Sequence, residues 1–415
     1  MEAPRPHRPL PIRAINAAGG AAARLGLRLP SLAEDALLEA ARKQTGLRDF
    51  GQGGFRAGLH QLLASLERDA QLTTIGRSMA RGQIGSALAN RLQLVEHRKQ
   101  HPEVGEQRIE RPLFVLGLPR TGTTILYGLL AQDPAHRSPL SWEVAAPCPP
   151  PRPETYESDP RIARMDAEFD QLRRLAPGFD AIHPMAARLP QECVAITAMD
   201  FHSVQFGASY NVPSYEDWLT EQDLRPSYRF HYAFLQHLQS ECARERWVLK
   251  SPGHLPFIGA LLDVYPDAMI VQTHRDPLDV LASVSSLECV LRSAASDAVD
   301  PLEIGPQQVD LWSRTLRTGI EQRELATTHA NQFFDVHFPE LLADPLACVQ
   351  RIYEHFDLEL TKEAEEEMAR FLADNARDKH GTHRYSLETF GIDAAVHGRG
   401  FDDYCERYGV VRKTR

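Results

Sequence analysis

The sequence lacks any long apolar segment. Nowhere among its 415 residues does an apolar run approach the length of about 18 residues that a membrane-spanning helix requires. The N-terminus, MEAPRPHRPLPIRA, is interrupted by prolines where a secretion signal has its apolar centre. These two absences predict a protein without a transmembrane segment that stays in the cytoplasm.

Closely spaced cysteines are also missing. The chain has six cysteines, and none of them forms a C-x-x-C pair. Such spacing would be expected of a structural zinc site, and a dense disulfide framework would be expected of a small secreted domain. The scattered pattern predicts reduced thiols and no bound metal. The six are Cys148, Cys193, Cys242, Cys289, Cys348 and Cys405.

An excess of basic residues is absent as well, because the formal net charge is −10 at pH 7. This balance argues against nucleic acid as a partner and against broad binding to anionic membranes. Any anionic ligand must therefore be held by a few well-placed cations. The hydrophobic fraction of 43% and the charged fraction of 25% are those of a globular protein.

The stretch PLFVLGLPRTGTTILYGLL, residues 112–130, is the most informative part of the chain. The apolar segment 113–117 is typical of a buried strand, residues 117–122 form a glycine-containing turn, and helical spacing begins at Thr123. A strand, a tight loop and a helix in direct succession are typical of a phosphate-binding site, because the first N–H groups of the helix are free to bind an anion.

This loop departs from the Walker sequence G-x-x-x-x-G-K-[ST] in one position. Gly117, Gly122 and Thr124 match the pattern, but Thr123 replaces the lysine that contacts the β- and γ-phosphates of a nucleoside triphosphate. The cation of the loop is Arg120 instead. The pattern therefore predicts an anion other than Mg-bound ATP.

The rest of the chain predicts three regions. Residues 1–28 have little periodicity and are interpreted as a disordered leader. Residues 29–110 form an N-terminal helical region, in which Ser31 caps a helix that ends near Gly46 and a second helical segment breaks near Gly76.

Residues 111–408 are predicted to form an α/β domain: a P-loop-like parallel sheet flanked by helices, with the N-terminal region as a helical cap and a helical insertion at about 155–245 on the substrate side. Strands are expected at 113–117, 139–142, 247–250, 268–274 and 333–338. Between residues 201 and 234 there are nine aromatic residues, where the 8% average would give about three. They suggest either core packing or a substrate lid.

Three stretches together resemble the sulfotransferases that use 3′-phosphoadenosine 5′-phosphosulfate (PAPS). They are GLPRTGTT at 117–124, VLKSPGHLPFI at 248–258 and HRDPLDVLAS at 274–283. With LSWE at 140–143, the sequence from about residue 30 to 408 looks like the large bacterial-type branch of that family. The resemblance implies that PAPS is the co-substrate.

The resemblance also assigns roles to individual residues. It implies that Lys250 and Arg120 are catalytic and that Arg275 and Ser283 bind the 3′-phosphate. Arg275 ends a strand and Ser283 lies in the second turn of the following helix, so both can face the edge of the sheet where ligands bind. The implied binding residues for the 5′-phosphosulfate are Arg120, Thr121, Gly122, Thr123 and Thr124.

Two residues are candidates for the base that takes the acceptor proton. His254 resembles the histidine of the phenol and steroid enzymes, and Glu143 resembles the base glutamate of the tyrosylprotein enzymes. The sequence leaves both open. The cytosolic animal enzymes have a tyrosine where this chain has Phe338, and Arg384 or Arg399 could replace their missing C-terminal phosphate loop.

The predicted activity is transfer of a sulfuryl group to a hydroxyl of a small-molecule, lipid or glycan acceptor. Such a transfer requires alignment and charge stabilisation rather than a metal ion. Two alternatives remain at this level: a P-loop kinase, and a nucleotide-binding module without sulfotransferase activity. No feature of the sequence indicates the oligomeric state.

Overall fold

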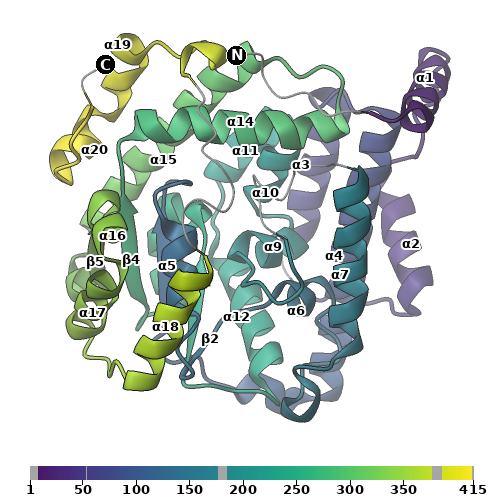
Figure 1. The fold of residues 1–415 in the computed structure, drawn as a ribbon. Coiled ribbons are helices and arrows are strands. Elements are labelled where there is room, and N and C mark those ends of the chain that lie inside the picture. Colours follow the sequence, from purple (N-terminus) through teal and green to yellow (C-terminus); the bar gives the residue numbers. More distant parts are fainter. Residues whose placement is uncertain (1–7, 53, 176–184, 376–385, 414–415) are drawn as a thin grey trace.

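The structure is a computed structural model that describes residues 8–52, 54–175, 185–375 and 386–413. Within these residues the centre of the fold is one sheet whose five strands are all parallel and lie in the order β2-β3-β1-β4-β5 (Figure 1). The predicted α/β fold with a parallel sheet flanked by helices is confirmed. The strands are β1 Leu113–Gly117, β2 His136–Arg137, β3 Arg246–Lys250, β4 Met269–His274 and β5 Phe333–His337.

Helices surround this sheet on both faces (Figure 1). Those before the sheet are α1 Leu10–Arg24, α2 Glu34–Thr45, α3 Phe55–Arg68 and α4 Thr74–Gln100. Those between β1 and β3 are α5 Thr123–Leu130, α6 Ser141–Ala145, α7 Pro160–Leu175, α9 Cys193–Thr197, α10 Gln205–Ser209, α11 Pro213–Thr220 and α12 Arg225–Gln239. The later helices are α13 Ile258–Val264, α14 Pro277–Ala295, α15 Pro301–Leu325, α16 Phe338–Ala343, α17 Pro345–His355, α18 Lys362–Asp374, α19 Ala394–His397 and α20 Asp402–Arg407.

Strand β1 is buried on both faces. Leu113 and Val115 pack with α5, α17 and α18 on one side of the sheet, whereas Phe114 and Leu116 pack into the larger core on the other side. A strand covered by helices on both faces is apolar at every position, because neither set of alternate side chains meets water. This explains the uninterrupted apolar run that marks β1 in the sequence.

The strand, loop and helix units around the sheet agree closely with the sequence predictions. Helix α5 begins at Thr123, and β3 and β4 lie within one residue of their expected bounds. Asp276 caps α14 by accepting a hydrogen bond from the N–H of Leu278 at 3.0 Å, and Pro277 is the first residue of that helix.

Three local predictions are wrong. Residues 10–24, expected to lie in a disordered leader, form helix α1, whereas residues 1–7 lie outside the described part of the chain. The helix expected to be capped by Ser31 begins at Glu34, and the break expected near Gly76 lies before Thr74.

The contacts of α1 explain why a segment without clear periodicity is helical. The Asn16 side chain accepts a hydrogen bond from the N–H of Ile75 at the start of α4, and a Cβ at Gly19 would overlap Thr74. Small residues therefore let α1 lie directly against α4.

The short strand expected at 139–142 is also wrong. The strand in this part of the chain is β2, which begins three residues earlier, and helix α6 covers the second half of the expected range. Glu143 determines the change, because its carboxylate accepts a hydrogen bond from the N–H of Leu140 at 2.7 Å and so caps the first turn of α6.

The nine aromatic residues of 201–234 are mainly core residues. Six of them are buried and the other three are partly buried against the same hydrophobic cluster. That cluster also contains side chains of α2, α3 and α4, and the buried ion pair between Arg91 of α4 and Asp200 joins the two regions at 2.8 Å. The N-terminal helices and the insertion thus share one core, while the domain boundaries proposed from the sequence stay a prediction.

Within the described ranges, no helix is both long enough and apolar enough to cross a lipid bilayer.

Candidate active site

Three of the stretches singled out in the sequence end at the same edge of the sheet. Strand β1 lies between β3 and β4, with Val115 opposite Lys250 and Gly117 opposite Thr273. The loop after β1, the end of β3 and the residue after β4 are therefore neighbours. In an open parallel sheet this carboxyl edge is where ligands bind.

The loop after β1 has a conformation that needs its glycines. Gly117 and Gly122 have φ values of 146° and 91°, and a Cβ on Gly122 would lie 2.7 Å from Leu341. Arg120 also has a positive φ, 65°, at the exposed tip of the loop. The Thr121 hydroxyl lies 2.6 Å from both the carbonyl oxygen of Leu118 and the Thr273 hydroxyl, and so fixes the loop to β4.

The start of α5 presents donors to this loop. Gly122 is the N-cap residue and provides no side-chain cap, so the first N–H groups of the helix have no intrahelical partner. The side chain of Thr123 is buried, whereas that of Thr124 is exposed. An anion at this position would thus meet backbone N–H groups and one hydroxyl, and Thr121 and Thr123 would act through the backbone.

Lys250, the last residue of β3, points to the same helix. Its Nζ lies 3.4 Å from the Thr124 hydroxyl and forms an ion pair with Glu192, and the side chain is 7% exposed. Glu192 was not predicted from the sequence, because it lies in an insertion of irregular pattern and has no motif around it. Only the packing of α9 against β3 brings it to Lys250.

Arg275 connects the end of β4 to the loop. Its Nη1 donates to the carbonyl oxygen of Arg120 at 2.8 Å, and its guanidinium lies 4.2 Å from the ring centre of Phe338. Asp279 lies 3.7 Å from Nη2, and the buried Nε has no partner among the described residues. Burial lowers the pKa of Arg275, although Asp279 opposes the shift. The guanidinium therefore has one N–H group, at Nε, that can still donate to a ligand. Ser283, the other residue assigned to the 3′-phosphate, is half-buried in α14.

A basic residue near the C-terminus also approaches this region. The Lys413 Nζ lies 2.7 Å from a carboxylate oxygen of Asp279, next to Arg275. Lys413 was not predicted, because it lies beyond the expected domain boundary of residue 408. Of the two arginines considered as replacements for a phosphate loop, Arg399 is exposed and Arg384 lies outside the described residues.

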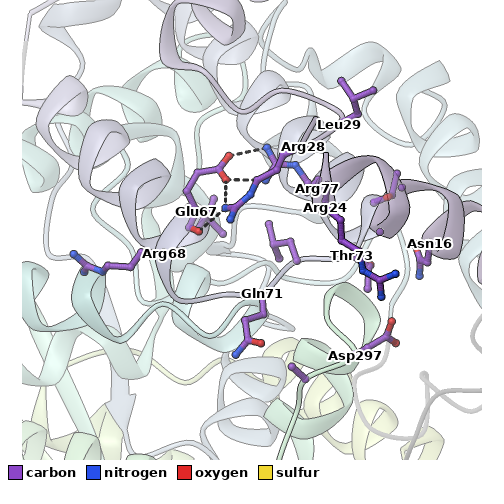
Figure 2. A pocket seen from close by; sticks show the side chains of 17 residues that line it. Asn16, Arg24, Arg28, Leu29, Glu67, Arg68, Gln71, Thr73, Arg77 and Asp297 are labelled. Atoms are coloured by element: carbon purple, nitrogen blue, oxygen red, sulfur yellow. Dashed lines mark hydrogen bonds and ion pairs between the residues drawn. The ribbon is translucent and has the colours of Figure 1, made fainter. Parts of the chain in front are cut away.

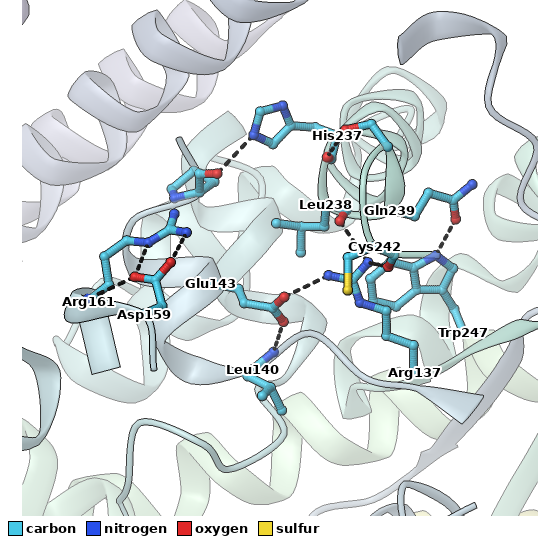
Figure 3. A network of polar contacts seen from close by, with 12 residues as sticks. Arg137, Leu140, Glu143, Asp159, Arg161, His237, Leu238, Gln239, Cys242 and Trp247 are labelled. Atoms are coloured by element: carbon cyan, nitrogen blue, oxygen red, sulfur yellow. Dashed lines mark hydrogen bonds and ion pairs between the residues drawn. The ribbon is translucent and has the colours of Figure 1, made fainter. Parts of the chain in front are cut away.

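Glu143 occupies a closed polar site rather than an open one (Figure 3). Its side chain is completely buried, and its two oxygens accept hydrogen bonds from Arg137 and from the N–H of Leu140, each at 2.7 Å. Arg137 is in turn held by the carbonyl oxygen of Leu238 at 2.7 Å and lies over the ring of Trp247. In this arrangement neither carboxylate oxygen of Glu143 faces solvent.

His254 is buried as well. Its Nδ1 lies 2.8 Å from the Tyr228 hydroxyl, and its Nε2 has no partner among the described side chains. Burial, with a smaller contribution from nearby His231, lowers the pKa of His254 well below its usual value of 6.5. The imidazole is therefore neutral at physiological pH. It lines a cavity of about 20 Å³, large enough for one water molecule.

The variant His254→Gln tests the histidine of the sequence prediction. A histidine base would make turnover fall by about 10² to 10⁴ on substitution. Because His254 is buried and hydrogen-bonded to Tyr228, we expect a loss of less than about tenfold, well below that range. Turnover measured against pH, with both substrates saturating, distinguishes the two results.

The same variant has a second readout in stability. Since the folded-state pKa of His254 is depressed, the unfolded chain binds a proton there below about pH 6.5 that the folded chain does not bind. Stability should fall as the pH drops through that value, and less steeply in His254→Gln. Equal slopes of thermal unfolding temperature against pH would contradict the depressed pKa.

A large hollow near the N-terminus lies away from this site. It has a volume of about 670 Å³ between α1, α3 and α4, and Figure 2 shows Arg28 and Arg77 meeting the carboxylate of Glu67 at its wall. None of the residues assigned to the site from the sequence lines it. The convergence of cations at the sheet edge, rather than cavity size, identifies the candidate site.

The parallel sheet thus has a P-loop-like turn and three cations, Arg120, Lys250 and Arg275, at its carboxyl edge, an arrangement that suits an anionic ligand. A family model described as "Sulfotransferase family" matches residues 112–362, which include all three cations. The chain belongs to the sulfotransferase family and is a sulfotransferase.

Solved structures of mycobacterial sulfotransferases are similar to this chain over nearly its whole length. STF1 from Mycobacterium tuberculosis H37Rv is 39% identical, covers 89% of this chain and 98% of its own, and superposes with a TM-score of 0.81. STF9 from Mycobacterium avium is 31% identical, covers 93% and 99%, and has a TM-score of 0.85.

A further relative is known by its activity. The omega-hydroxy-beta-dihydromenaquinone-9 sulfotransferase Stf3 of Mycobacterium bovis is 26% identical over 319 residues, which are 73% of this chain and 76% of Stf3.

Proposed function

We propose that this sulfotransferase moves a sulfuryl group from PAPS to a hydroxyl of a lipid-like acceptor. The observation that carries the proposal is the convergence of Arg120, Lys250 and Arg275 at neighbouring strand ends, where Arg275 donates to the backbone of Arg120 and Lys250 contacts Thr124. PAPS carries two separate anionic groups, the 5′-phosphosulfate and the 3′-phosphate, and each of them needs its own cationic partner.

The residues present fit such a donor. The N–H groups at the start of α5, with Arg120 and Thr124, would hold the 5′-phosphosulfate. Arg275, whose Nε has no partner among the described residues, would hold the 3′-phosphate together with Ser283. Phe338 lies beside both Arg275 and Gly122 and offers a ring surface to the adenine.

The chemistry assigned to the chain is alignment and charge stabilisation. As sulfur moves from the donor phosphate to the acceptor oxygen, negative charge grows on the phosphate oxygen that leaves. Lys250 and the N–H groups of α5 are preorganised donors for that charge. Catalysis on this basis does not require a metal ion.

The acceptor is proposed to be a lipid-like alcohol. The support for this class is the relative Stf3, which is named for a hydroxylated menaquinone. Nucleic acid is not part of the proposal. We also propose a cytoplasmic location, because all six cysteines are unpaired thiols.

Titration calorimetry tests the donor. Wild-type protein should bind 3′-phosphoadenosine 5′-phosphate (PAP) tightly in the presence of a chelator and should bind ATP weakly with or without Mg²⁺. Mg²⁺-dependent ATP binding would instead support a kinase. Tight PAP binding without any transfer from PAPS would support a binding module.

An acceptor screen completes the test. Radiolabelled PAPS is incubated with the protein and either total lipid extract or the aqueous fraction of the same cells. Label should appear in the lipid fraction, and products found only in the aqueous fraction would contradict the proposed acceptor class.

A further inference from the structure

Glu192 is the one carboxylate that the structure places in direct contact with Lys250 among the described residues. Its side chain is 23% exposed, whereas Glu143 and His254 are buried. Lys250 also lies 3.4 Å from the Thr124 hydroxyl, so Glu192, Lys250 and the first turn of α5 meet at one point. The Glu192 carboxylate therefore lies close to any group that is transferred next to Lys250.

The backbone before Glu192 is fixed by other elements. The Gln191 N–H donates to the carbonyl oxygen of Pro139 at 2.7 Å, and the Gln191 carbonyl accepts from the hydroxyl of Tyr127 in α5 at 3.0 Å. On the other side, the Cys193 thiol accepts a hydrogen bond from the backbone of Lys250. Burial raises the pKa of Cys193 to about 12, so this thiol is protonated and does not compete as a nucleophile. Glu192 is thus held in place by α5 and β3 together.

The small buried cavity beside His254 adjoins the same two residues. Cys193 and Val194, which follow Glu192, line it on one side, and Ser251 and His254, which follow Lys250, line it on the other. Because this cavity holds only about one water molecule, an acceptor hydroxyl would reach Glu192 and Lys250 from the exposed side of Glu192. The carboxylate would then face the hydroxyl and the ammonium would face the donor.

We propose that Glu192 is the base that takes the proton of the acceptor hydroxyl, a role that rests on the proposed sulfotransferase reaction. The acceptor oxygen forms a bond to sulfur while the bond from sulfur to the 5′-phosphate oxygen of the donor breaks. The electron pair of the broken bond stays on that phosphate oxygen, and the acceptor proton passes to the Glu192 carboxylate. The ion pair with Lys250 holds the carboxylate beside the start of α5 before the substrates bind.

The contacts of the two candidates from the sequence favour this assignment. Both oxygens of Glu143 are occupied by Arg137 and Leu140, and Nδ1 of His254 is occupied by Tyr228. Glu143 would have to give up a buried hydrogen bond before meeting an acceptor. Nε2 of His254 has no partner among the described residues, but it lies buried beside a cavity of only about 20 Å³. Glu192 has only to release Lys250, which the anionic donor attracts at the same time.

The test compares Glu192→Gln and Glu192→Asp with wild type and with Glu366→Gln, which removes the carboxylate of an exposed lysine–glutamate pair, Lys362 and Glu366. Three quantities are measured: PAP binding by calorimetry, transfer from radiolabelled PAPS to total lipid extract, and slow hydrolysis of PAPS, in which water is the acceptor. Thermal unfolding checks that each variant is folded.

We expect Glu192→Gln to bind PAP within a few-fold of wild type and to lose turnover by about 10² to 10⁴, in transfer and in hydrolysis. Glu192→Asp should retain part of the activity. The ratio of wild-type to Glu192→Gln turnover should shrink as the pH falls, since protonation removes the base from the wild type as well. A further variant, Glu192→Gly, should regain part of its activity when formate is added, because formate supplies the missing carboxylate. The control Glu366→Gln should behave as wild type.

Two results would overturn the assignment. Turnover of Glu192→Gln within about threefold of wild type would show that no proton is taken at this position. A loss confined to the Michaelis constant for PAPS would make Glu192 a counterion of Lys250 only. Failure of the wild type to bind PAP would instead contradict the proposed donor, so the two failures are distinguishable.

Discussion

Replacing Lys250 by alanine is expected to lower turnover by about 10² to 10³, corresponding to about 2.7–4 kcal/mol of lost transition-state stabilisation. The reason is position: Nζ lies beside Thr124 at the start of α5, where the leaving oxygen gains charge as the reaction proceeds. Interactions that strengthen in the transition state appear in kcat rather than in substrate affinity. Steady-state rates at saturating PAPS measure kcat, and calorimetry measures the affinity for PAP.

The ion pair with Glu192 requires a control in this experiment. Removing Lys250 leaves an unpaired carboxylate beside an anionic donor, which would weaken PAP binding by repulsion alone. The double variant Lys250→Ala/Glu192→Gln removes that repulsion. It should recover PAP affinity but not turnover. Lys362→Ala, at an exposed ion pair, controls for loss of a lysine. Unchanged kcat with a raised Michaelis constant for PAPS would make Lys250 a ground-state binding residue.

Replacing Arg275 by alanine is expected to weaken PAP binding about 30- to 150-fold, the equivalent of about 2–3 kcal/mol for a charge-assisted bidentate contact. Affinity for adenosine 5′-phosphosulfate, which has no 3′-phosphate, should change much less. The guanidinium is held beside the loop by Arg120 and Phe338, so its geometry is set before the ligand arrives. Calorimetric titration of both ligands measures the difference.

Arg351→Ala is a matched control, because this arginine of α17 forms an exposed ion pair with Glu340 and is not one of the proposed binding residues. It should leave both affinities unchanged. Equal losses for the two ligands in Arg275→Ala would contradict binding of the 3′-phosphate at Arg275. They would point instead to collapse of the loop after β1, which Arg275 contacts through the carbonyl oxygen of Arg120.

The proposed donor side of the site was predictable because its residues are close in sequence to the elements that position them. Arg120 lies in the loop between β1 and α5, Lys250 ends β3, and Arg275 follows β4. Apolar strands and a capped helix start are local signals, and parallel strands place their carboxyl ends at one edge. The patterns of strand, loop and helix were therefore sufficient to predict that these three residues lie at the carboxyl edge of the sheet.

The proposed acceptor side was not predictable in the same way. Glu192 lies 58 positions from Lys250 along the chain, in the predicted helical insertion, where no motif marks it. Likewise, Glu143 could be located but its burial against Arg137 could not, since that pair depends on how α6 packs against α12 and β3. Side-chain accessibility and ion-pair partners are properties of packing between elements.

The sequence by itself determined the sheet, the loop after β1 and the cations of the proposed donor site, because each depends on short-range patterns of apolar, glycine and capping residues. Only the tertiary structure decided which of the nine aromatic residues are core, that residues 10–24 fold against α4, and that Glu192 rather than Glu143 or His254 meets Lys250. These outcomes depend on contacts between distant segments, for which the order of residues in one chain carries no local signal.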